Sequence, residues 1–126
     1  MSRRTFAYAL ASLLVLLMTV EAAQAATTGQ VVNKSDAAVR VKVIHVTNPR
    51  IYWDVGVLQA GQASQFVPLD FGSRQVIVKS AFTERILKTE DFEVVDDGLG
   101  RLIEITGSAV NGTLTVTIKF PKKAPN

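Results

Sequence analysis

Hydrophobic side chains recur at every second position over several segments of the chain. The alternation is clear at residues 39–43, 51–57 and 114–120, where Val, Ile, Leu, Trp or Phe takes turns with polar or small residues. A period of two directs successive side chains to opposite faces of a β-strand, so one face is buried and the other meets water. The pattern therefore predicts antiparallel sheets with one wet face.

Short turn signals separate the alternating segments. These signals are Asn33-Lys34-Ser35-Asp36, Asn48-Pro49-Arg50, Ala60-Gly61, Phe71-Gly72-Ser73, Asp97-Gly98-Leu99-Gly100 and Asn111-Gly112. Strands interrupted this often predict an all-β fold: a single antiparallel β-sandwich of immunoglobulin-like type with about eight or nine strands. Residues 81–93, AFTERILKTEDFE, fit a helical turn or two as well as a strand, and we favour the strand.

Trp53, the only tryptophan, shares its alternating register with Ile51, Val55 and Val57. We expect it on the apolar face of a central strand, filling the space between two sheets as the strand-C tryptophan of immunoglobulin domains does. The predicted wet face of this strand and the turn before it supply our candidate contacts with a partner. These residues are Asn48, Pro49, Arg50, Tyr52 and Asp54.

The first 25 residues have the pattern of a secretory signal peptide. Arg3 and Arg4 precede a run of 14 uncharged residues, 7–20, which is shorter than the roughly 20 residues of a membrane-spanning helix. The small-residue segment Ala23-Gln24-Ala25 supplies an A-x-A cleavage site. We expect residues 1–25 to be removed, leaving one domain at 26–126 with no stable membrane insertion, located in the periplasm or secreted from a bacterial cell envelope.

The charge and cysteine content narrow the class of protein further. The predicted mature chain has a net charge of about +2, too small to favour nucleic acid as a partner. The chain contains no cysteine, so no disulfide stabilises the predicted exported domain and packing has to suffice.

No residue pattern predicts a catalytic, cofactor or metal site. His45 is the only histidine, and its register with Val39, Val41 and Val43 places it at the end of a strand near the core rim. One histidine without cysteine is a poor ligand set for zinc. Residues 93–104 match the calcium loop at four positions, but apolar Val95 occupies the third ligand position, so we interpret Asp97-Gly98 as a hairpin turn.

These observations favour a non-enzymatic exported envelope protein that binds or helps to assemble another envelope or extracellular protein through sheet edges or loops. The alternative is a secreted proteinaceous inhibitor of an extracellular enzyme, which would present the loop Thr47-Asn48-Pro49-Arg50 to its target. The oligomeric state is not predicted.

The signal peptide can be tested directly. The sequence of the exported protein, read from its N-terminus, should begin at or near Ala26, whereas uncleaved chain in washed membranes would contradict the interpretation.

Arg3-Arg4 resembles a twin-arginine signal, which carries proteins across the membrane already folded. Because the apolar run is typical of general secretion, we expect export of the Arg3→Lys, Arg4→Lys double variant to continue, and its accumulation inside the cell would indicate the twin-arginine route.

Overall fold

The structure, a computed structural model, describes residues 27–122. The predicted signal peptide, residues 1–25, lies outside the described residues, so its removal stays a prediction.

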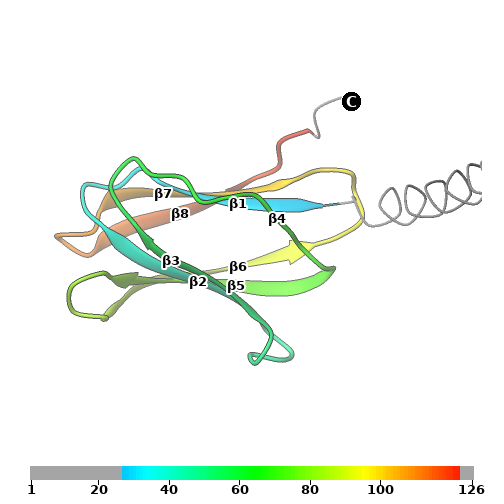
Figure 1. Cartoon of the computed structure of the whole chain (residues 1–126), viewed down its shortest axis with the longest axis horizontal. Coiled ribbons are helices and arrows are strands. Elements are labelled where there is room, and N and C mark those ends of the chain that lie inside the picture. Colours follow the sequence, from blue (N-terminus) through cyan, green and yellow to red (C-terminus); the bar gives the residue numbers. More distant parts are fainter. Residues whose placement is uncertain (1–26, 123–126) are drawn as a thin grey trace, which may run out of the picture.

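Eight β-strands make up the regular structure of the described chain (Figure 1). In chain order they are β1 (Thr28–Asn33), β2 (Val39–His45), β3 (Tyr52–Leu58), β4 (Val67–Pro68), β5 (Gly72–Ser80), β6 (Ile86–Val94), β7 (Arg101–Ser108) and β8 (Thr113–Lys119). The predicted all-β class is confirmed. The strand predicted within residues 81–93 is also confirmed, since β6 begins at Ile86 after a turn.

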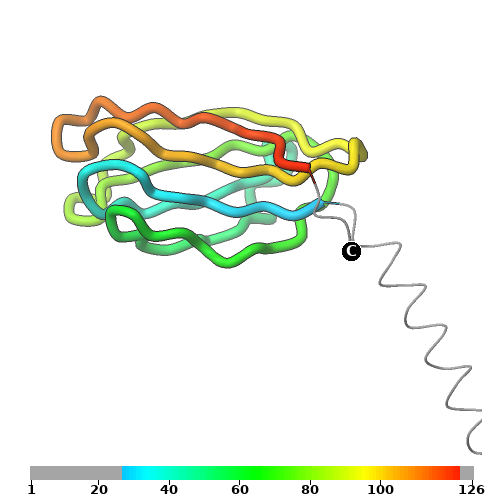
Figure 2. Tube along the Cα trace, turned by 90° about the horizontal axis from the view of Figure 1, so that it is seen from above, coloured from blue at the N-terminus to red at the C-terminus, as the bar shows by residue number. Residues whose placement is uncertain are grey.

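The strands form two four-stranded sheets that lie face to face (Figure 1). One sheet has the order β4-β1-β7-β8 and the other β3-β2-β5-β6. All pairs are antiparallel except β1 and β7, which run parallel and lie side by side in Figure 2. This order differs from the ABED and CFG sheets of immunoglobulin constant domains, so an immunoglobulin-like topology is not confirmed.

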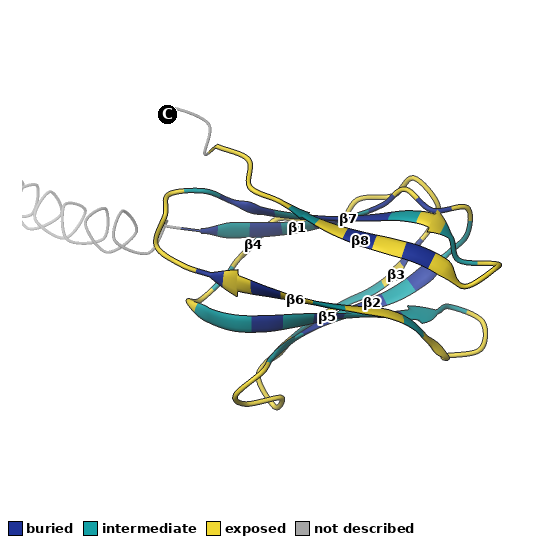
Figure 3. Ribbon diagram, turned by 180° about the vertical axis from the view of Figure 1, so that it is seen from behind, coloured by how far each residue is buried: buried dark blue, intermediate teal, exposed yellow. Residues whose placement is uncertain are grey.

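The core consists of the side chains that the two sheets direct toward each other. Val41 and Val76 from one sheet and Ile103 and Ile105 from the other are completely buried, and dark blue segments mark buried positions on both layers in Figure 3. Burying one face of each sheet is the main source of stability for a domain without disulfides.

The structure corrects our prediction for β3 in two ways, through a bulge and through the place of the strand in its sheet. Two residues of β3, Val55 and Gly56, lie where the register shifts against β2, and Gly56 has a φ of +81°. The extra residue reverses the alternation, so Val57 is exposed and Leu58 is buried. Trp53 packs against the core but is only partly buried, and β3 is an edge strand. The apolar face predicted for Trp53 is therefore confirmed, but the central, fully core-filling position is wrong.

The Asp97-Gly98 turn also differs from our prediction. It follows β6 and precedes β7, which belong to different sheets, so it is a connection between layers and not a hairpin turn. Gly98 has the positive φ, +71°, that such a tight turn favours. Asn111-Gly112, by contrast, joins the antiparallel strands β7 and β8 and is a hairpin turn as its sequence indicates.

Asn33, at the end of β1, is completely buried and fully hydrogen-bonded. Its side-chain nitrogen donates to the carbonyls of Ala37 and Leu58, both at 2.9 Å. Its side-chain oxygen accepts from the backbone N–H and the hydroxyl of Ser35, at 3.0 and 2.6 Å. Because Leu58 belongs to the opposite sheet, this one amide links the two layers at the point where the chain crosses between them.

We expect Asn33→Ala to lower the free energy of unfolding by about 3 kcal/mol, since it leaves buried carbonyl and N–H groups without partners. The matched control is Asn48→Ala, the same substitution in an exposed loop, which should cost less than about 0.5 kcal/mol. Urea denaturation measures both. Equal losses for the two variants would contradict the role of the Asn33 amide.

Candidate functional site

The loop between β2 and β3 carries three of the five residues we predicted to contact a partner. Asn48, Pro49 and Arg50 are all exposed. The carbonyl of Asn48 accepts a hydrogen bond from Ile51 N at 2.9 Å, and its side chain accepts a weaker bond from Arg50 N at 3.3 Å. The loop is thus an exposed turn with internal hydrogen bonds.

The other two predicted residues, Tyr52 and Asp54, lie on the outer side of edge strand β3. Tyr52 is 53% exposed, and the ammonium group of Lys42 lies 4.0 Å from the centre of its ring. Asp54 accepts a hydrogen bond from Gly56 N at 3.1 Å, so its side chain supports the bulge. The structure brings Tyr52 next to the loop, whereas Asp54 lies one position further along the outer face.

A cavity of about 120 Å³ lies beside Tyr52, between β3 and the segment that joins β4 to β5. It brings together His45, Asp70 and Arg74. His45 is the last residue of β2 and is half-buried, as its register predicts. We did not predict Arg74, although its register with Val76 and Val78 already directs it inward from β5.

The surroundings of His45 in this cavity favour its neutral form. Its Nδ1 atom accepts a hydrogen bond from the guanidinium of Arg74, so the ring proton is on Nε2. Burial, together with the charge of Arg74, lowers the pKa of His45 below its usual range, while Asp70 acts in the opposite direction. Burial also lowers the pKa of Arg74, but an arginine remains charged at neutral pH.

The four edge strands differ in how well they are protected against pairing with another chain. β4 has two residues and contains Pro68. β3 and β6 are both bulged, and β6 also carries charged side chains along its length. β8 has seven residues, TLTVTIK, in unbroken register with β7 and with no charge before Lys119. Proline, bulges and charges are the usual protection of sheet edges, and β8 lacks all three before its final residue.

The backbone groups on the outer edge of β8 can be assigned from its partner strand. Ile105 directs its carbonyl toward β1, because this carbonyl accepts a hydrogen bond from Lys34 N at 2.7 Å. Val116 is paired with Ile105, so its N–H and C=O point away from β7. By alternation, Leu114 and Ile118 also direct their backbone groups outward.

A hollow with both apolar and charged walls lies beside this edge, where β8 faces β6 across the open flank of the two sheets. A pocket of about 520 Å³ lies at the far end of both strands, and Phe92, Ile118 and Phe120 contribute its apolar walls. Glu90, Asp91 and Glu93 line the same pocket from β6. We call β8 together with this pocket the β8 groove.

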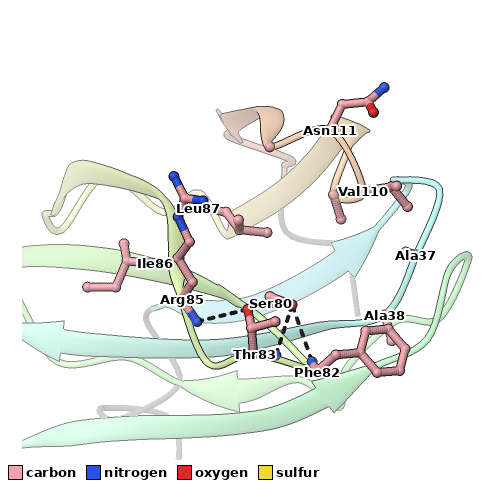
Figure 4. A pocket seen from close by; sticks show the side chains of 12 residues that line it. Ala37, Ala38, Ser80, Phe82, Thr83, Arg85, Ile86, Leu87, Val110 and Asn111 are labelled. Carbon is pink, nitrogen blue, oxygen red and sulfur yellow. Dashed lines mark hydrogen bonds between the residues drawn. The ribbon is translucent and has the colours of Figure 1, made fainter.

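A second pocket, of about 530 Å³, lies at the end of the sandwich where β6 and β8 begin (Figure 4). The loops before β2, β6 and β8 meet there. Phe82 and Val110 are 82% and 75% exposed at its rim. This end of the sandwich therefore exposes apolar side chains of its own.

The described residues contain no cluster of three His, Asp or Glu side chains that could hold a metal ion. Nor do they contain a helix that is both long and apolar enough to cross a membrane. The chain matches no protein-family model and no curated protein sequence.

An ion pair between buried Arg101 and exposed Asp97 closes the β8 groove at the start of β7. Arg101 is 2% exposed and donates two hydrogen bonds to the carboxylate of Asp97, at 3.2 and 2.9 Å. It also donates to the carbonyls of Glu93, Leu99 and Gly100, and its guanidinium lies 4.6 Å from the centre of the Phe120 ring. Hydrogen bonds from Arg101 and Leu99 N lower the pKa of Asp97.

This ion pair predicts a pH-dependent loss of stability. Because the folded pKa of Asp97 is lowered, its contribution is complete above the pKa of the unfolded carboxyl, about 4, and is lost as the pH falls through the lower folded value. Asp97→Asn should therefore lower Tm at pH 7, and the difference from wild type should shrink below about pH 4. Asp96→Asn, an exposed neighbour, is the control. A Tm difference that is constant with pH would contradict this role.

Proposed function

We propose that this protein is a non-enzymatic exported protein of the bacterial cell envelope, and that it binds another polypeptide by adding a strand of the partner to the edge of β8. The single observation that carries the proposal is that β8, alone among the four edge strands of the described chain, is long, regular and uncharged before its last residue. Natural sheets rarely leave such an edge unprotected, because it pairs with other chains.

The β8 groove supports strand addition as the binding mode. Backbone N–H and C=O groups of Leu114, Val116 and Ile118 would form the ladder with the incoming strand. Alternate side chains of that strand would enter the groove beside the inward side chains of Val116 and Ile118, which line its pocket. Hydrogen bonds to the main chain give affinity, and pockets for alternate side chains give specificity.

The alternative function, inhibition of an extracellular enzyme, is supported by a different observation. The loop at residues 47–50 is exposed and its turn is held by hydrogen bonds of Asn48. A loop with a fixed conformation loses little entropy on entering an active site. The β8 edge has no part in this mode, so the two functions predict different sensitive residues.

Capture from an envelope extract by the immobilised wild-type protein tests the proposal. Ile118→Lys places a charge in the groove and should reduce capture of the partner by about tenfold or more, since it removes an apolar contact and buries a charge. Val57→Lys is the control, because it makes the same kind of change on the opposite edge strand. Circular dichroism verifies that both variants fold.

The outcomes separate the two functions. A partner lost with Ile118→Lys but kept with Val57→Lys supports strand addition. A captured hydrolase that is inhibited by wild type, retained by Ile118→Lys and released by Arg50→Ala would instead establish the inhibitor. Equal capture by all variants would overturn the β8 edge as the binding surface.

A further inference from the structure

Two arginines occupy equivalent positions at one end of the fold. Arg74 begins the inward register of β5, and Arg101 begins that of β7, so both side chains enter the space between the sheets. They are 3% and 2% exposed. Both strands start at the same end of the sandwich, opposite the pocket in Figure 4.

The two buried cations differ in their partners. Arg101 is paired with the carboxylate of Asp97. Arg74 donates instead to two neutral acceptors, Nδ1 of His45 and the carbonyl oxygen of Asp70 at 2.5 Å. In the described part of the chain, no carboxylate oxygen lies within 4.0 Å of its guanidinium. The charge of Asp70 acts on Arg74 only from beyond direct contact. A buried cation without a directly paired carboxylate is incompletely compensated, and such a group can bind an anion.

The cavity of about 120 Å³ beside Arg74 has the size and lining for a small anionic group. Trp53 and Leu69 contribute apolar walls. His45 lines the same cavity, and its N–H is on Nε2 because Nδ1 accepts from Arg74. Since a water molecule takes about 30 Å³ in the liquid, the cavity has room for a carboxylate with a short aliphatic group.

We propose that this cavity binds a carboxylate, with Arg74 as the charged donor and His45 as the neutral one. Arginine matches the planar, two-oxygen geometry of a carboxylate. Arg74 is the single cation of the site, and the negative charge of Asp70 lies nearby. Because Asp70 repels anions, the site suits a ligand with one negative charge better than a phosphate dianion. The site lies on the flank of β3 and β4, away from β8, so this inference does not depend on the proposed function.

Acetate is the first probe, because Trp53 lines the cavity and is the only tryptophan of the chain. At constant ionic strength, acetate should change Trp53 fluorescence with saturation, whereas neutral acetamide should not. The bound negative charge should also raise the pKa of His45, whose charged neighbours are Arg74 and Asp70. NMR of the ring protons of His45 measures this pKa. If Arg74 has only a structural role, acetate should change neither the Trp53 fluorescence nor the pKa of His45.

Three variants make the test specific. Arg74→Gln should weaken acetate binding by about tenfold or more, because the charged donor is lost. Arg74→Lys keeps the charge and should retain part of the affinity for acetate. It provides the test if Arg74→Gln fails to fold. Asp70→Asn removes a nearby negative charge and should tighten binding by about threefold. Lys119→Gln, on β8, should have no effect.

Two further ligands identify the source of the carboxylate. If N-acetylalanine binds more tightly than acetate and the amide of N-acetylalanine does not bind, the ligand is the C-terminal carboxylate of a polypeptide. Equal affinity for N-acetylalanine and acetate would indicate a small free carboxylate. The proposal is overturned if acetate gives no saturable signal, if acetamide or phosphate acts as strongly, or if Asp70→Asn and Arg74→Gln leave binding unchanged.

Discussion

The buried amide of Asn33 is the interaction on which the arrangement of the two sheets depends. A chain that crosses from one sheet to the other has to carry its backbone polar groups past the end of an apolar core, where water cannot reach them. Asn33 supplies partners for these groups through its side chain, and its own backbone bonds to Gln62 and Gly61 in the loop after β3. The crossover, the loop and the opposite sheet are thereby fixed together by one residue.

That loop explains why the two flanks of the molecule differ. After β3 the chain runs back beside β1, where Ser64 N donates to Val31 O at 2.7 Å and Ser64 Oγ accepts from Val31 N at 2.9 Å. The short strand β4 continues this contact, so the flank of β3 and β4 is covered by the chain itself. No described segment covers the flank of β6 and β8 in the same way. The unprotected strand therefore lies on the side that the topology leaves open.

The sequence predicts the strands well where alternation is unbroken, as in β2 and β8, because burial of one face depends only on the period. The alternation does not predict which side chains are buried at the end of β3. A bulge at Gly56 reverses the buried and exposed faces for the residues that follow, and no residue pattern before it indicates this reversal. The hairpin predicted at Asp97-Gly98 failed for another reason: local turn chemistry does not determine which sheet the next strand joins. Of the candidate site, exposure of the loop and Tyr52 was predictable, but their contact with a partner stays a prediction.

Buried arginines carry a signal that the alternation analysis could have used. In RQVIV of β5 and RLIEI of β7, the arginine falls in register with inward-facing Val or Ile residues, so its charge must enter the core end of the strand. A charge there requires a counter-ion, a set of carbonyl acceptors or a ligand. For Arg101 the structure provides Asp97 and three carbonyls in direct contact. For Arg74 it provides an imidazole, one carbonyl, a cavity and the charge of Asp70 beyond direct contact. Because Arg101 shows how this fold neutralises an inward arginine from within, the different surroundings of Arg74 point to an anion from outside.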